Sequence, residues 1–61
     1  MRDSKRIFDV TATLATGWLY CPDLRFMQLI ENFKAWYQKD VFYLEDDEFL
    51  EAFQQYIIEN T

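Results

Sequence analysis

Carboxylates form the densest group of side chains that could do chemistry. Glu45, Asp46, Asp47 and Glu48 are consecutive, and Glu51 follows one helical turn later. Calcium needs about six to eight oxygen ligands, and an EF-hand loop alternates its acids around a required glycine. The run has neither feature, and consecutive helical residues point about 100° apart, so their carboxylates do not converge on one ion. We therefore predict no metal site and no cofactor, and expect these acids to stabilise the positive end of a helix.

The chain offers few nucleophiles. Cys21 is its single cysteine and Ser4 its single serine, and no histidine is present to act as a base for either. Cys21 also lies close to Asp23, whose negative charge opposes formation of a thiolate. Because Gly17 is the single glycine, a glycine-rich phosphate loop is excluded as well. We predict that the protein is not an enzyme.

Aromatic side chains make up 20% of the chain, more than short helices can bury together. Tyrosine and tryptophan are enriched at protein interfaces, so the surplus either contacts a partner or forms half-buried lids over a small core. The rings that we expect to be partly exposed are Trp18, Tyr20, Trp36, Tyr37, Tyr43 and Tyr56. The interaction site that we predict comprises Trp36, Tyr37, Tyr43, Glu45, Asp46, Asp47, Glu48 and Glu51.

The elements that position these residues follow from apolar periodicity. In the central segment Phe26, Leu29, Ile30 and Phe33 recur at the spacing of one buried helix face. We expect Asp23 to cap this helix, since its carboxylate can accept backbone N–H groups of the first turn. Pro22 pushes the residue before it out of helical geometry, so a break precedes the helix.

Two further helices flank the central one. Ile7, Val10, Leu14 and Trp18 are expected to line one side of the first, and Gly17 to mark its end. Asp46 is the expected N-cap of the last helix. Its predicted buried stripe is Phe49, Leu50, Phe53 and Ile57, with Tyr56 beside it.

The segment Val41-Phe42-Tyr43-Leu44 has high β-propensity but no partner strand elsewhere in the chain. We interpret it as an extended linker in which Phe42 and Leu44 plug the core; the alternative is a strand that pairs with the same segment of another chain. The predicted fold is therefore all-α, a small three-helix domain with short loops. Residues 1–61 form a single helical domain, with helices at roughly 4–18, 24–37 and 46–59.

At 61 residues the domain is near the lower size limit for independent folding, and it has neither a disulfide nor a zinc site. Its stability must come from the core, from a partner or from self-association. No apolar stretch approaches the roughly 20 residues that span a bilayer, and we expect no signal peptide. We predict a cytoplasmic, soluble protein without a membrane partner.

The net charge of −5 is unevenly distributed. Residues 1–40 carry six basic and five acidic side chains, whereas residues 41–61 carry six acidic and no basic ones. The acidic third opposes direct binding of nucleic acid, because phosphate would be repelled. It suits a protein partner with a basic surface, or it is simply a solvated face.

Two segments together resemble a family of small uncharacterised proteins of bacteria and their phages. They are Pro22-Asp23-Leu24-Arg25-x-x-Gln28-Leu29-Ile30 and Phe42-Tyr43-Leu44-Glu45-Asp46-Asp47-Glu48. The similarity spans nearly the whole chain, although this chain has Met27 where the family often has a small residue. The family has no established activity, so the resemblance implies no catalytic residues.

We therefore expect a small acidic protein-interaction module without enzymatic activity. A concrete form is an inhibitor encoded by a phage or mobile element, whose acidic surface occupies the nucleic-acid site of a host protein. The alternative is a structural helical homo-oligomer, such as a homodimer, with no separate partner.

Overall fold

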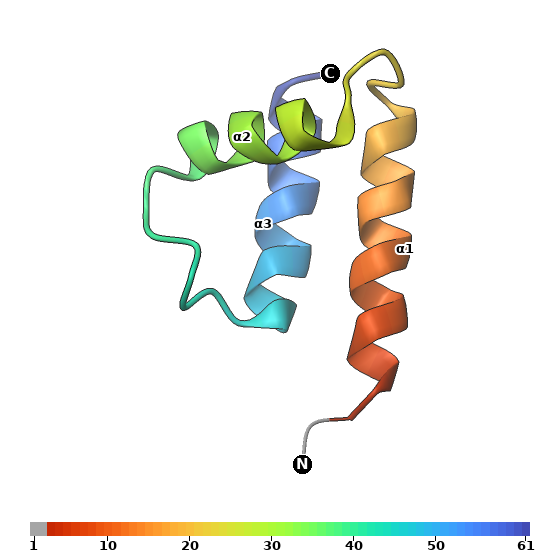
Figure 1. Cartoon of the computed structure of the whole chain (residues 1–61), viewed down its shortest axis with the longest axis vertical. Helices are drawn as coiled ribbons and strands as arrows, with labels where there is room; N and C mark the ends of the chain where they lie inside the picture. Colours follow the sequence, from red (N-terminus) through yellow and green to blue (C-terminus); the bar gives the residue numbers. More distant parts are fainter. Residues whose placement is uncertain (1–2) are drawn as a thin grey trace.

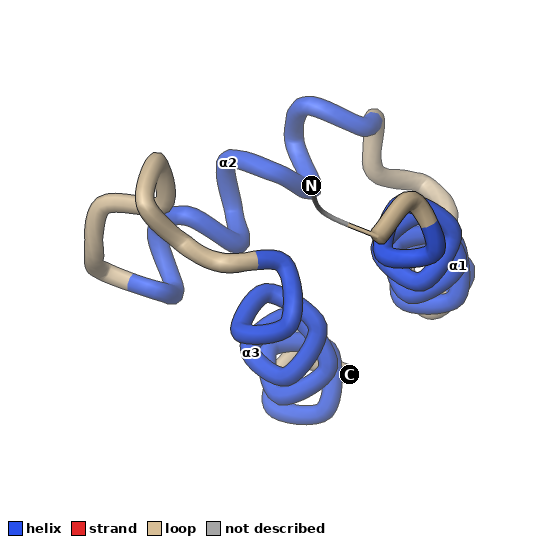
Figure 2. Tube along the Cα trace, turned by 90° about the horizontal axis from the view of Figure 1, so that it is seen from below, coloured by secondary structure: helices blue, strands red, loops and turns tan. Residues whose placement is uncertain are grey.

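The computed structural model of the chain describes residues 3–61, which contain α1 (Lys5–Leu19), α2 (Phe26–Tyr37) and α3 (Asp46–Glu59). No strand occurs within this range, which confirms the predicted all-α three-helix domain. α1 and α3 lie side by side and run in the same direction, and α2 lies across α3 and extends away from α1 (Figure 1). Seen along the two parallel helices, α2 and its loops occupy one side and leave the other open (Figure 2).

The observed helix bounds differ from the predicted ones mainly at the start of α2, which begins at Phe26 and not at residue 24. Cys21–Leu24 instead form a turn, in which the Leu24 N–H donates to the Cys21 carbonyl at 3.2 Å. Pro22 occupies the second position of this turn, where its fixed φ is favourable. The Leu24 carbonyl accepts a hydrogen bond from the Trp18 indole N–H at 2.8 Å, which ties the turn to α1.

The predicted caps of two helices were wrong by one or two residues. Arg25, and not Asp23, is the N-cap of α2, and its N–H donates to Gln28 Oε1 at 2.8 Å. Glu45, and not Asp46, caps α3, and its N–H donates to Glu48 Oε1 at 3.3 Å. In both helices the side chain three residues into the helix reaches back to the cap, a pairing that fixes where the helix begins.

Gly17 does not end α1, because the helix continues to Leu19. Gly17 is the one buried residue of α1, and the Phe53 ring of α3 packs directly over it. A Cβ at this position would overlap that ring and lie 3.0 Å from Ile57 Cγ1. The glycine therefore permits α1 and α3 to approach closely, which outweighs its low helix propensity.

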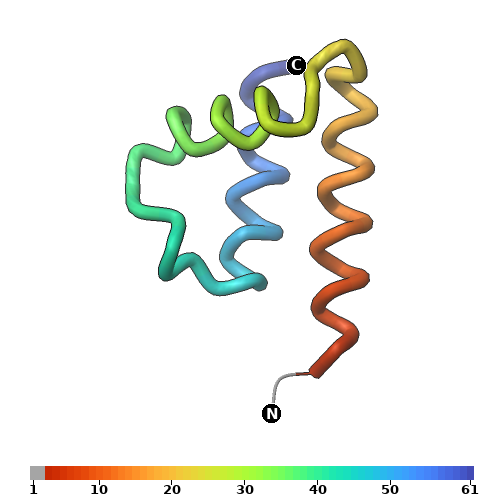
Figure 3. Tube along the Cα trace, in the orientation of Figure 1, coloured from red at the N-terminus to blue at the C-terminus, as the bar shows by residue number. Residues whose placement is uncertain are grey.

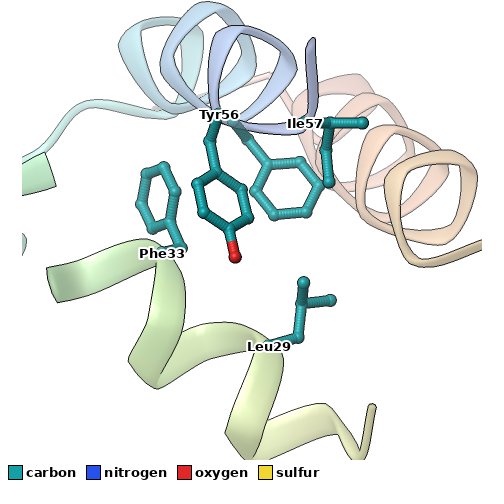
Figure 4. Close-up of a cluster of buried hydrophobic side chains, with 5 residues drawn as sticks. Leu29, Phe33, Tyr56 and Ile57 are labelled. Atoms are coloured by element: carbon teal, nitrogen blue, oxygen red, sulfur yellow. The ribbon is translucent and has the colours of Figure 1, made fainter. Parts of the chain in front are cut away.

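The core lies between α2 and α3 (Figure 4) and consists of Leu29, Phe33, Phe53, Tyr56 and Ile57. Phe33 is its centre, since the Phe49, Phe53 and Tyr56 rings all meet it edge-on at centroid distances of 5.4, 5.6 and 5.8 Å. Edge-to-face pairs of this kind contribute about 0.5–1.5 kcal/mol each beyond their buried area.

Predictions of exposure were wrong for Tyr56, for Ile7 and for Phe26, which was expected on the buried face of α2 but is 42% exposed at the first position of that helix. Tyr56 is buried, because α2 covers it between Phe33 and Leu29 (Figure 4). Ile7, predicted to line the buried side of α1, is 51% exposed. The first turns of α1 extend past the start of α3 (Figure 1), so no helix covers Ile7 there.

Candidate interaction site

The loop between α2 and α3 presents two exposed rings, Phe42 and Tyr43, which are 81% and 79% exposed. Their centroids lie 4.9 Å apart with the rings nearly perpendicular, so each ring limits the freedom of the other. The prediction that Phe42 plugs the core was wrong, whereas Leu44 packs against the core as predicted. We call Phe42 and Tyr43 the aromatic tip.

Local hydrogen bonds hold the aromatic tip in place. α2 ends at Tyr37, and the left-handed backbone of its C-cap Gln38 (φ 62°) turns the chain away from the helix axis. The Phe42 N–H donates to Asp40 Oδ1 at 2.9 Å, and the Leu44 N–H donates to the Val41 carbonyl at 3.1 Å. The second bond closes a turn, not the extended linker that β-propensity suggested.

This turn explains which side chains are buried. Val41 and Leu44, at its two ends, point the same way and are half-buried against the core. Phe42 and Tyr43, between them, face outward at the edge of the molecule (Figure 3 shows the loop). The signal that could have revealed this was Asp40, since an aspartate two residues ahead favours such a turn.

The acidic run begins directly after the aromatic tip. Asp46 Oδ2 lies 3.1 Å from Arg6 Nε, an ion pair without hydrogen-bond geometry that joins the starts of α3 and α1. With side chains 38% and 41% exposed, the pair contributes at most about 1 kcal/mol. Asp47 Oδ1 accepts the Glu48 N–H at 2.9 Å. Part of the run thus serves the helix start, while Asp47, Glu48 and Glu51 remain exposed.

Trp36 and Tyr37, also predicted for the site, lie elsewhere. Both are half-buried and pack against the core, and the Trp36 indole N–H donates to Glu59 Oε1 at 3.0 Å near the end of α3. Glu59 and Asp46 are 13 positions apart on α3, or about 20 Å along its axis. The structure therefore groups Tyr43 with the acids and separates Trp36 from them, where it serves as a lid of the core.

Hydrogen bonds also set the charge state near Trp36. Donation from the Gln55 amide, and then from the Trp36 indole, lowers the pKa of Glu59 below its ordinary value of 4.5. In the core, burial raises the pKa of Tyr56 above 10.0. Both groups are thus held in the states that they have at neutral pH, which suits structural roles.

Within residues 3–61, no group of three or more histidine, cysteine, aspartate or glutamate side chains is placed to hold a metal ion. Over the same range, none of the helices combines the length and apolar character required to cross a membrane. No family model matches the chain, and neither curated proteins nor solved structures give a significant match. The resemblance to the small bacterial and phage proteins stays a prediction.

Proposed function

We propose that the protein is a small interaction module without enzymatic activity, which binds a partner protein through the aromatic tip and the acids that follow it. The observation that carries this proposal is the exposure of Phe42 and Tyr43 on a hydrogen-bonded loop. Exposed aromatic rings are unfavourable in water, and they serve as anchors when a partner desolvates them.

The partner's surface should be basic. Asp47, Glu48 and Glu51 are exposed beside the tip, and residues 41–61 contain no basic side chain. Charges at the rim of an interface mainly accelerate association, whereas a buried aromatic anchor mainly slows dissociation. The two parts of the site thus have separate and measurable roles.

A protein that normally binds nucleic acid has a surface of this kind. We propose, as the more specific form, a cytoplasmic inhibitor encoded by a phage or mobile element, whose carboxylates take the place of phosphates on a host protein. Such binding competes with nucleic acid, so a short duplex should displace the inhibitor from its target.

Affinity capture from the native host, followed by mass spectrometry, tests the proposal. We expect wild type to retain a basic protein, and the double variant Phe42→Ala/Tyr43→Ala to lose it. Phe8→Ala is the matched control, because Phe8 is 71% exposed on a different element. Equal capture by all three chains would contradict the assignment of the site.

The acids call for a kinetic test on the captured partner. Replacing Asp47, Glu48 and Glu51 by their amides should slow association and flatten its salt dependence while leaving dissociation nearly unchanged. Phe42→Ala should instead speed dissociation. If the association rate changed neither in the amide variant nor with salt concentration, the result would argue against a basic partner.

A further inference from the structure

A groove runs between α1 and α3 on the face that α2 leaves open (Figure 2). Its volume is about 540 Å³. Gly17, Phe53 and Ile57 lie at its base and are already buried, whereas its walls are exposed and include Ala12, Thr16 and Gln54. Tyr20 and Ile58 line it as well and are 66% and 68% exposed, so each projects into solvent next to the hollow.

No charged side chain lines this groove. Its polar side-chain groups are threonine hydroxyls, the Tyr20 hydroxyl and the Gln54 amide, although 28% of the whole chain is charged. A chain with a net charge of −5 repels its own copies over most surfaces. The groove is an exception, since the side chains that line it bring no like charges together when two copies meet.

We propose that the α1–α3 face binds a second copy of the chain, forming a two-fold symmetric dimer. In a two-fold interface each patch meets itself, so it must contain both a hollow and a projection that fits it. The groove supplies the hollow, and Tyr20 and Ile58 supply the projections. Inserting them would bury the apolar surface of Tyr20 and Ile58, which the single chain leaves exposed.

The charges outside the groove fix the orientation. Because α1 and α3 run in the same direction, the acidic start of α3 lies at one end of the face (Figure 1). A parallel dimer would place the two acidic runs together, whereas an antiparallel one places them at opposite ends. The proposed two-fold axis is therefore perpendicular to α1 and α3.

The proposed dimer interface is larger than the groove itself. A stable interface buries about 800 Å² on each partner, which is about one sixth of the 4913 Å² that the domain exposes. The molecule measures 36 × 23 × 19 Å, so an interface of this size would also take in the turns of α1 and α3 that flank the groove. Domains this small that lack disulfides and metals commonly gain stability by association.

Sedimentation equilibrium tests the dimer. We expect wild type at high micromolar concentration to have twice the monomer mass of 7.5 kDa. Ile58→Lys and, separately, Tyr20→Lys should give monomers with unchanged helical circular dichroism, weakening association at least about tenfold. Leu19→Lys is the matched control, since Leu19 is 75% exposed near the end of α1 but does not line the groove, and should leave the dimer intact.

Several results would overturn the proposal. One is that the wild-type chain stays monomeric at millimolar concentration. This result would overturn the proposal whether or not the groove binds an uncharged aromatic dye. Another is a dimer that Ile58→Lys and Leu19→Lys weaken equally. For the orientation, spin labels at Asp47→Cys in a Cys21→Ser chain should lie more than about 25 Å apart, given the helical rise. A shorter separation would contradict the antiparallel arrangement.

Discussion

The Phe53 ring of α3 packs against the backbone of Gly17 in α1. The contact is so close that a Cβ atom added at Gly17 would overlap the ring. Phe53 is fully buried, and its ring also stacks on Phe49 at 5.3 Å, which restricts any movement away from α1. This contact explains why the single glycine of the chain is found inside a helix.

Gly17→Ala should therefore destabilise the fold, although alanine is the better helix former. Overpacking costs about 1–3 kcal/mol, and the gain in helix propensity offsets about 1 kcal/mol of it. Urea denaturation followed by circular dichroism measures the difference. Ala15→Gly, at an exposed position of the same helix, is the control and should cost only the propensity term. A more stable Gly17→Ala chain would show that the contact is not tight.

Leu29 and Phe33 carry the α2 side of the core, being 0% and 3% exposed. We expect Leu29→Ala or Phe33→Ala to cost about 2–5 kcal/mol, enough to unfold most of a domain with so little stability to lose. Met27→Ala, on the same helix but 58% exposed, should melt like wild type. Thermal melts of the three variants make the comparison, and normal melting of both core variants would contradict the assigned core.

The acidic run is predicted not to bind calcium or magnesium. An ion that bound only the folded chain would raise the melting temperature by mass action. Adding either ion at millimolar concentration should leave the melting temperature within error of the value in an equal ionic strength of sodium chloride. A rise of several degrees in calcium alone would reveal a site.

Glu59 should titrate below 4.5 in a carbon-detected NMR experiment, because Gln55 and Trp36 both donate to its carboxylate. Gln55→Ala should raise this pKa, and Trp36→Phe should raise it by less. Because the folded-state pKa is the lower one, the stabilisation is present above pH 4.5 and is lost as the pH falls through the folded-state value. An unchanged pKa in both variants would mean that neither hydrogen bond persists in solution.

Periodicity was sufficient for the helices, because each apolar stripe is long and the Pro22 break is unambiguous. It placed Leu29, Phe33, Phe53 and Ile57 in the core correctly. It could not place Phe42, since whether a short apolar segment is extended or turned depends on a hydrogen bond from its backbone to Asp40. The β-propensity of the four residues does not take that hydrogen bond into account.

The candidate site was predictable only in part. Tyr43 and the acids are neighbours in sequence and remain neighbours in space, whereas Trp36 is turned toward Glu59. The groove was not foreseen, because short loops usually join antiparallel neighbours. Here α2 lies across α3, and this crossing, which no local pattern specifies, leaves one face of α1 and α3 open.

The parallel course of α1 and α3 has a consequence for how the chain folds. Gly17 and Phe53 meet although 36 positions separate them in the sequence (53 − 17). Contacts between distant segments slow folding, because the entropy cost of closing a long loop comes before the contacts form and stabilise the chain. During synthesis α1 leaves the ribosome before α3, and Gly17 cannot meet Phe53 until the 36 residues from position 18 to position 53 have been added. We therefore expect folding to be slower than in a helical hairpin of the same length.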